Sequence, residues 1–284
     1  MSGKLKLMIS IWQAVILGIV QGATEFLPVS SSGHILLAAK VLDIPTNLTA
    51  ETLLNIGTIA VIAIFFRRQI WSVTQDLFGK TLNLIQKKEI VLKLTIGVVP
   101  AILVGIVFGD FIEKNLHGPA TVALMLAVVG VAMMLIKEKR SIYSKEKVAR
   151  ESLNTNLVQE VSFKQAAIVG LVQPLALISG TSRSGVTILA GMWVGLKIET
   201  AATFSFLIGL PVILGATLKF MVSSEGLDFI KSNFGAVLFG NLASFVVGFG
   251  AVYLLMDVVK KRGLKPFGIY RIILAIAVAL FILL

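Results

Sequence analysis

Two short polar stretches interrupt an otherwise apolar sequence and hold residue types that can do chemistry. The first, EFLPVSSSGHILL at 25–37, contains the carboxylate of Glu25, three serines and the imidazole of His34. The second, SGTSRSGVT at 179–187, places Arg183 between two serines. A carboxylate or imidazole can transfer protons, a serine or histidine can act as a nucleophile, and a guanidinium can bind an anion in a forked geometry.

The composition indicates that these polar stretches lie within a membrane. Of the 284 residues, 56% are hydrophobic and 14% are charged, and the mean hydropathy is +0.92, which is typical of a polytopic membrane protein. Ionisable side chains at membrane depth cost free energy, so each is a candidate functional residue. The chain has no cysteine, which excludes thiol catalysis and disulfides. The net charge of +11 does not predict a nucleic acid partner, because basic residues of membrane proteins gather in cytoplasmic loops.

Six apolar segments are long enough to be membrane spans. They are 52–66, 91–109, 119–136, 201–218, 235–256 and 268–284, and the first is expected to extend back through Leu48. Residues 70–90 mix apolar and charged residues at helical spacing, which predicts a helix lying in the membrane interface. We therefore expect a single integral membrane domain over residues 1–284.

The two polar stretches lie in segments that repeat each other at an offset of 152 residues. QAVILGIVQGATEFLPVSSSGHILLA from Gln13 aligns with QAAIVGLVQPLALISGTSRSGVTILA from Gln165, with eleven identical pairs, several of them small or polar. Shared hydrophobicity alone would not produce such matches. We predict one repeat over 12–136 and a second over 164–284, joined by a polar cytoplasmic linker at 137–163.

Each repeat starts with two apolar segments that are too short to cross a membrane. Irregular backbone at membrane depth must be satisfied by protein or by a water-filled cavity, so we predict a re-entrant helix hairpin in each repeat. A continuous helix kinked at Pro28 or Pro174 is the alternative. Three spans follow each hairpin, so the second repeat is expected to face the opposite way. The predicted fold is an all-α, inverted-topology repeat.

The distribution of lysines and arginines predicts how this fold is oriented. Most of them, Arg271 included, fall on the face that carries the linker. That face is predicted to be cytoplasmic. Both termini and the mouth of the first hairpin are then expected to face outward.

Together the two hairpin tips predict a site for a phosphate-bearing ligand. Both Ser-Gly elements lead into a new half-helix, whose N-terminal N–H groups and dipole attract phosphate. The candidate catalytic residues are Glu25, Ser31, His34 and Arg183, and the candidate binding residues are Gln21, Ser32, Gly33, Ser182, Gly185 and Thr187. Either His34 or Ser31 could be the nucleophile, with Glu25 as general acid or base.

Other interpretations of the same residues stay open at this point. Glu25 and Arg183 could form a purely structural salt bridge, and Glu25 could be the proton-coupling carboxylate of a transporter. Ser30 and Ser184 are expected to satisfy the hairpin backbone. A contact between Glu25 and His34 would require the chain to turn back after Pro28.

At these motifs the sequence resembles the bacterial undecaprenyl-diphosphate phosphatase family, which is also known for conferring bacitracin resistance. The resemblance covers nearly the whole chain and rests on four stretches. They are QGATEFLPVSSSGH at 21–34, SGTSRSGVT at 179–187, FSFLIGLPVILGAT at 204–217 and PFGIYRIILA at 266–275. It implies hydrolysis of undecaprenyl diphosphate to undecaprenyl phosphate and inorganic phosphate at the outer face of the bacterial cell membrane. The substrate would be a polyprenyl diphosphate lipid, and the reaction would recycle the carrier lipid of peptidoglycan synthesis.

The sequence departs from the family pattern at two positions. Ser179 stands where the family usually has proline, and Gln21 is neutral where some members carry a second acid. No cofactor is certain. A divalent cation, Mg²⁺ or Ca²⁺, would have to use Gln21 and Glu25.

Two further expectations concern the second candidate function and the oligomeric state. Opposed hairpins also build secondary transporters, so a transporter or flippase for a polyprenyl phosphate or another anion is the alternative. Small residues of the fifth span fall near small-xxx-small spacing, which would suit either a homodimer or packing within one subunit. They are Gly240, Ala243, Ser244 and Gly248. Membrane lipid is an expected partner, and nucleic acid is not.

Overall fold

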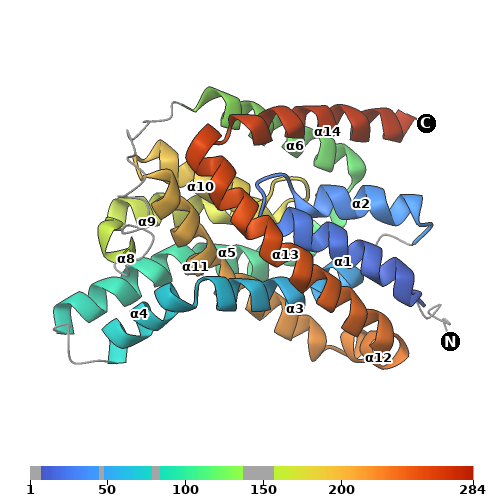
Figure 1. Ribbon diagram of the computed structural model, residues 1–284, viewed down its shortest axis with the longest axis horizontal. Helices are drawn as coiled ribbons and strands as arrows, with labels where there is room; N and C mark the ends of the chain where they lie inside the picture. Colours follow the sequence, from blue (N-terminus) through green and yellow to red (C-terminus); the bar gives the residue numbers. More distant parts are fainter. Residues whose placement is uncertain (1–7, 45–47, 79–83, 137–156, 284) are drawn as a thin grey trace.

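The computed structural model describes residues 8–44, 48–78, 84–136 and 157–283, and these form helices joined by short turns (Figure 1). The helices of the first half are α1 (Ile11–Glu25), α2 (Ser31–Val41), α3 (Leu48–Phe65), α4 (Arg67–Phe78), α5 (Leu84–Asn115) and α6 (Pro119–Leu135). Those of the second half are α8 (Leu157–Glu160), α9 (Phe163–Val172), the 3₁₀ helix η1 (Gln173–Leu177), α10 (Arg183–Trp193), α11 (Ile198–Met221), α12 (Ser224–Ser232), α13 (Phe234–Arg262) and α14 (Lys265–Leu283).

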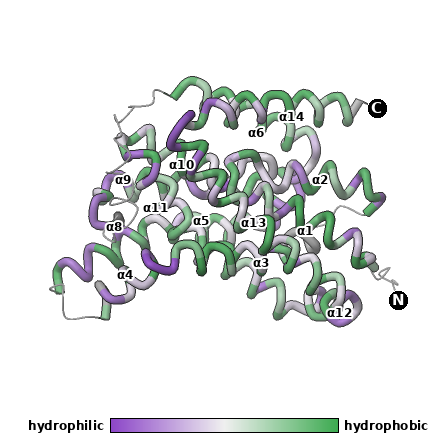
Figure 2. The backbone as a smooth tube through the Cα atoms, viewed as in Figure 1, coloured by the Kyte–Doolittle hydropathy of each residue, from purple (hydrophilic) through white to green (hydrophobic). Residues whose placement is uncertain are grey.

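The helices have the apolar character of a polytopic membrane protein, as the composition predicts. By length and hydropathy, three of the described helices, α5, α11 and α13, could each cross a membrane. Helices α3 and α4 would make a fourth span together, although the chain bends by 65° between them. Figure 2 shows hydrophobic residues along α3 and α14, whereas hydrophilic residues gather at α4, α8 and α12.

The six predicted spans differ from these helices in two places. The segment 119–136 forms the 17-residue helix α6, which is shorter than the other candidate spans. The segment 52–66 begins at Leu48, as expected, but ends where the chain bends into α4. A helix of 17 residues rises only about 25 Å. By length and composition, the described helices include three candidate spans, or four with the bent pair, and α6 and α14 are the two predicted segments not among them.

Both polar stretches end one helix and start another, as the hairpin prediction requires. Residues 152 apart in the two repeats also make the same local hydrogen bonds. Ser10 and Ser162 each form a capping box with the glutamine three residues later. That glutamine, Gln13 or Gln165, then donates through Nε2 at 3.1 Å to the backbone carbonyl just after the second helix of its pair. The sequence match thus reflects matched local structure.

Close helix packing at glycine explains part of the conserved pattern between the two repeats. Helix α1 packs on α13, and α9 packs on α5. A Cβ on Gly18 would lie 2.1 Å from the carbonyl oxygen of Gly240, and one on Gly170 would lie 2.3 Å from that of Ile96. Glycine is required at both positions because a side chain would collide with backbone. Each repeat's first helix therefore packs against a long helix of the other repeat.

The small residues of α13 are used inside the chain. Besides Gly240, which faces Gly18, Ser244 faces Gly22, whose added Cβ would lie 2.4 Å from the Ser244 carbonyl oxygen. This stripe therefore packs within one subunit at Gly240 and Ser244.

Three sequence predictions need correction. The interfacial helix predicted over 70–90 falls on two elements, α4, which ends at Phe78, and α5, which begins at Leu84, with residues 79–83 outside the described part of the chain. Most of the predicted linker, 137–156, lies outside the described residues, but its end is packed rather than solvated, since Val158 and Val161 are buried. Arg271, assigned above to the cytoplasmic face, is fully buried inside the protein. Its guanidinium donates hydrogen bonds to backbone carbonyl groups.

Candidate active site

Two serines with unusual backbone geometry form the tips of the α1–α2 and α9–α10 pairs. Ser30 has φ 76° and Ser182 has φ 68°, values that L residues rarely adopt. Each serine Oγ accepts a hydrogen bond from the N–H of a glycine three residues later, Gly33 at 3.3 Å or Gly185 at 3.2 Å. This cap starts α2 and α10 immediately after the tip.

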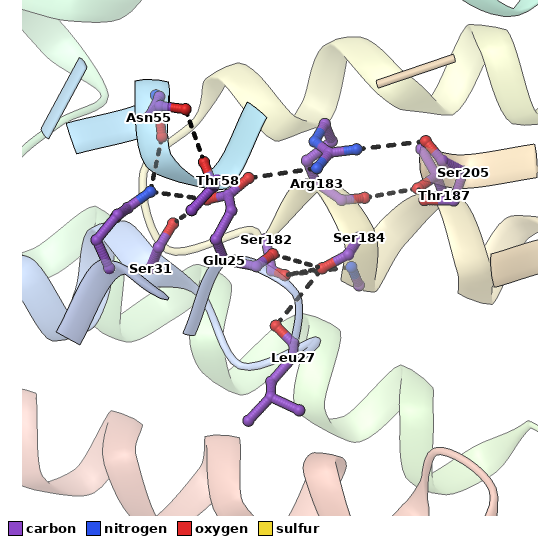
Figure 3. Close-up of polar contacts among 12 residues, drawn as sticks. Glu25, Leu27, Ser31, Asn55, Thr58, Ser182, Arg183, Ser184, Thr187 and Ser205 are labelled. Carbon is purple, nitrogen blue, oxygen red and sulfur yellow. Dashed lines mark hydrogen bonds and ion pairs between the residues drawn. The ribbon is translucent and has the colours of Figure 1, made fainter. Parts of the chain in front are cut away.

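The two tips contact each other although they are far apart in sequence. The N–H of Gly180 donates to Ser32 Oγ at 3.0 Å. Ser184 Oγ lies 3.4 Å from the carbonyl oxygen of Glu25 and 3.5 Å from that of Leu27 (Figure 3). Ser184 thus satisfies backbone of the opposite tip, which is the role expected for it. These contacts bring the first residues of α2 and α10 to one place.

Glu25, the last residue of α1, is the centre of the polar cluster (Figure 3). Its Oε2 accepts from Ser31 Oγ at 2.9 Å and from Gln21 Nε2 at 3.2 Å. Its Oε1 pairs with Arg183 Nη2 at 3.3 Å, and the two side chains are 12% and 9% exposed. The carboxylate is therefore almost fully desolvated and satisfied by one cation and two neutral donors.

The second repeat fixes Arg183 from several directions. Arg183 Nη1 donates to the backbone carbonyl of Ser205 at 3.3 Å, and Thr187 Oγ1 donates to the carbonyl of Arg183 at 2.7 Å. The guanidinium also lies 5.7 Å from the centroid of the Phe206 ring. Space for it comes from Gly209, where an added Cβ would lie 1.7 Å from Nη1. Thr187, predicted as a ligand-binding residue, is buried and bonds the backbone carbonyl of Arg183.

Some hydrogen-bonding capacity at this cluster is left over. Among the described side chains, buried atoms without a partner include Arg183 Nε, Thr181 Oγ1 and Gln21 Oε1. Guanidinium N–H groups and hydroxyls are donor types that bind phosphate oxygens. Arg183 Nε and Thr181 Oγ1 are thus buried donors of the second tip that the described protein groups leave unused.

The residues around Glu25 do not suit a divalent cation. Gln21 presents its amide nitrogen, not its oxygen, to Glu25, and the same nitrogen donates to Asn55 Oδ1 at 2.7 Å. Arg183 already balances the carboxylate. Mg²⁺ and Ca²⁺ require several oxygen ligands, and no group of three or more acidic, histidine or cysteine side chains suitable for a metal occurs in the described part of the chain. One carboxylate whose oxygens already accept from a hydroxyl, an amide and a guanidinium does not fit a metal.

His34 lies beside a different set of residues. Its Nδ1 is 2.7 Å from the carbonyl oxygen of Ser30, and its Nε2 is 2.7 Å from the hydroxyl of Tyr270. The two rings stack with an interplanar angle of 1°. In the described structure the imidazole hydrogen bonds thus go to Ser30 and Tyr270, whereas those of Glu25 go to Ser31, Gln21 and Arg183.

Three residues to which the sequence alone does not point contact the candidate side chains. Asn55 comes from α3, Ser205 from α11 and Tyr270 from α14. Asn55 and Ser205 belong to apolar helices, where an isolated polar residue carries little signal. Tyr270 lies within the PFGIYRIILA stretch that supports the family resemblance, which was the one available clue.

The fold and the cluster together define a helical integral membrane protein whose polar site lies between two helix-pair tips. Its chemistry, a hydroxyl hydrogen-bonded to a carboxylate beside a guanidinium, suits transfer of an anionic group. The chain belongs to the bacitracin resistance protein BacA family, whose model matches residues 14–277.

Curated relatives agree with this assignment over nearly the full length. The chain is 35% identical over 280 residues to the undecaprenyl-diphosphatase of Alteromonas mediterranea, covering 96% of this chain and 99% of the relative. It is 32% identical to the undecaprenyl-diphosphatase of Enterococcus faecalis, with 96% and 97% covered. It is 37% identical to undecaprenyl-diphosphatase 1 of Clostridioides difficile, with 95% and 96% covered.

Proposed function

We propose that this protein is an integral membrane phosphatase that hydrolyses undecaprenyl diphosphate to undecaprenyl phosphate and inorganic phosphate. Its family and the names of its relatives support the substrate. The observation that carries the chemistry is the convergence of Ser31 and Arg183 on Glu25. A nucleophile, a proton acceptor and a phosphate-binding cation are then within one cluster at the two tips.

In the proposed first step, Ser31 Oγ attacks the terminal phosphorus and its proton passes to Glu25. The bond between the terminal phosphorus and the bridging oxygen breaks, and undecaprenyl phosphate leaves. The 2.9 Å hydrogen bond between Ser31 Oγ and Glu25 Oε2 supports this pairing. Ser31 is favoured over His34 because its hydroxyl already contacts a proton acceptor.

In the second step, water hydrolyses the phosphoserine, releasing inorganic phosphate. Glu25, which has released the first proton to the departing undecaprenyl phosphate and is again a carboxylate, takes a proton from that water. It passes this proton to Ser31 Oγ as the bond between Ser31 Oγ and phosphorus breaks. Throughout, Arg183 neutralises charge on the transferring group, which is the main requirement of phosphoryl transfer. The N-terminal N–H groups of α2 and α10, capped by Ser30 and Ser182, add positive potential at the tips. Ser32, Gly33 and Gly185 are the remaining proposed binding positions.

For the membrane arrangement, we propose an inverted-topology repeat with six spans and two re-entrant hairpins. Two packings support it, that of α1 on α13 and that of α9 on α5. In each case the first helix of one repeat contacts the second predicted span of the other repeat, as expected for two equivalent halves. The beginning of α1 and the end of α14 lie at one side of the molecule (Figure 1), which agrees with both termini facing outward. The site would then open to the extracytoplasmic face of the bacterial cell membrane.

The test is phosphate release from undecaprenyl diphosphate by the purified protein in detergent. Wild type should release phosphate, and Ser31→Ala should lose activity by at least a hundredfold. Ser224→Ala is the matched control, because Ser224 is an exposed serine that also begins a helix, α12. A wild type that releases no phosphate in detergent would contradict hydrolysis and favour the transporter. Full activity in a folded Ser31→Ala variant would contradict the mechanism.

A further inference from the structure

Arg271 of α14 contacts both hairpin tips with a single guanidinium. Its Nη1 donates to the carbonyl of Pro28 in the first tip at 3.3 Å. Its Nη2 donates to the carbonyls of Gly180 at 2.8 Å and Thr181 at 3.1 Å in the second tip. The same side chain therefore bridges two backbone segments about 150 residues apart in sequence.

The remaining donors of Arg271 anchor this bridge to α6. Its Nε donates to the carbonyl of Leu126 at 3.4 Å, and Nη2 also contacts that of Met125 at 3.1 Å. The side chain is fully buried, and the salt bridges found among the described residues do not include it. A buried cation held only by carbonyl dipoles costs desolvation free energy, so stability alone is a weak reason for it.

The backbone is arranged to admit Arg271 at this position. Helices α6 and α14 approach closely at Gly130 and Gly268, where a Cβ on Gly268 would lie 2.7 Å from the Gly130 carbonyl oxygen. Gly180 has φ +90°, and a Cβ there would lie 2.6 Å from the carbonyl oxygen of Val122 in α6. The second tip thus lies directly against the backbone of α6, and α6 lies directly against that of α14.

Neighbouring contacts place the first hairpin on the same helix. Tyr270, the preceding residue of α14, holds His34 one turn into α2. Farther along both helices, Lys40 Nζ lies 3.8 Å from the centroid of the Phe281 ring. Side chains of α14 therefore contact α2 at two places, at His34 near its start and at Lys40 in its last turn.

We propose that Arg271 is a positioning residue that fixes the two tips relative to each other. It touches none of Glu25, Ser31 and Arg183 through a hydrogen bond in the described structure, so it acts through the backbone that carries them. Ser31 begins α2 and Arg183 begins α10, and the separation of these two residues is set by the separation of the tips. The kinetic consequence of this positioning rests on the phosphatase function proposed above.

The first test is kinetic and uses Arg271→Lys and Arg271→Gln in the purified protein. Lysine keeps the charge but cannot donate to both tips in a fork. We expect both variants to lower kcat at least tenfold and to change KM less than threefold, because misplaced reacting groups slow the chemical step. Lys265→Gln, an exposed cation on the same helix, should match wild type. A folded Arg271→Lys variant with wild-type kcat, or a change confined to KM, would overturn the proposal.

The second test measures the distance between the helices that follow the two tips, and it does not depend on activity. The chain has no cysteine, so spin labels can be attached at Val41→Cys and Trp193→Cys, the last residues of α2 and α10, which are 80% and 75% exposed. Electron–electron resonance should give a narrow distance distribution in wild type and in Lys265→Gln. In Arg271→Lys and Arg271→Gln it should broaden or shift. An unchanged distribution in these variants would overturn the proposal.

The two tests separate this proposal from the proposed function. If wild type releases no phosphate, the function is wrong, while the distance distribution still decides whether Arg271 holds the tips. If Ser31→Ala abolishes activity and both Arg271 variants keep wild-type kcat and distances, the function stands and the role of Arg271 is wrong.

Discussion

Ser31 and Arg183 occupy the same position in the two repeats and bind the two oxygens of one carboxylate. Each is the first residue of the helix that follows its tip, α2 or α10. Ser31 Oγ is 2.9 Å from Glu25 Oε2, and Arg183 Nη2 is 3.3 Å from Glu25 Oε1. The matched positions therefore carry different chemistry, a hydroxyl on one tip and a cation on the other.

Glu25→Gln tests the proton acceptor. The amide keeps the size of the side chain but removes its basicity, so kcat should fall at least a hundredfold, in line with the typical contribution of about 10²–10⁴ from general acid–base catalysis. Phosphate release by the purified variant measures this. Glu113→Gln, which alters an exposed acid in the last turn of α5, should be unaffected. Unaltered kcat in Glu25→Gln would exclude Glu25 as the base.

Chemical trapping distinguishes the two candidate nucleophiles. A phosphoserine survives acid, whereas a phosphohistidine does not, so acid quenching of wild type during turnover of terminally labelled substrate should retain label on the protein. Peptide mapping should place it on Ser31, and Ser31→Ala should retain none. Label that is lost in acid but stable in alkali, and absent from His34→Ala, would assign the nucleophile to His34 instead.

The Glu25–Arg183 pair predicts that removing one charge lowers stability more than removing both. Arg183→Gln leaves a carboxylate that is 12% exposed without its cation, which should lower the free energy of unfolding by about 3 kcal/mol. In Glu25→Gln/Arg183→Gln both charges are gone, so thermal stability in detergent should recover while activity stays absent. A double variant no more stable than Arg183→Gln would show that the pair is not the source of the loss.

Gly209→Ala tests how closely Arg183 is confined. The new methyl group would lie 1.7 Å from Nη1, so the guanidinium must move away from Glu25, and activity should fall at least tenfold. The matched control is Gly215→Ala on the same helix, where a Cβ meets nothing within 4 Å. Both variants replace a helical glycine and should gain helix propensity alike. Equal activity in the two would contradict the predicted displacement.

The backbone of the tips makes a prediction about Ser182. Alanine removes the cap to Gly185 and keeps a Cβ at φ 68°, so Ser182→Ala should cost about 1 kcal/mol of stability or more. Ser182→Gly also loses the cap but adopts this φ without strain. Thermal melting in detergent should therefore rank wild type and Ser182→Gly above Ser182→Ala. If alanine is the more stable replacement, φ at this residue is not a constraint.

The local features of the fold could be predicted from the sequence. The offset of 152 residues located both tips, because the same caps and glutamine contacts recur at matching positions. Glycine occurs at both 18 and 170 because at each position a side chain would collide with the backbone of a neighbouring helix. Such features depend on a few neighbouring residues and therefore leave a pattern in the sequence.

The lengths of the elements were harder to predict. The bend between α3 and α4 falls at Phe66, whose ring lies against Phe206 of α11, and Val161 is buried in a cluster with residues of α11. Hydropathy does not report such contacts, because apolar residues suit a lipid-facing surface and a protein interior equally well.

The sequence by itself determined the membrane character, the two polar tips and the residue types available there. Only the tertiary structure decided which of these residues meet. Glu25 contacts Ser31 across the tip and Arg183 from the other repeat, whereas the His34 ring hydrogen-bonds Tyr270. Arg271 is buried between the tips rather than exposed on a face. These pairings depend on how helices far apart in sequence pack, and an isolated polar residue in an apolar helix does not reveal its partner until that packing is known.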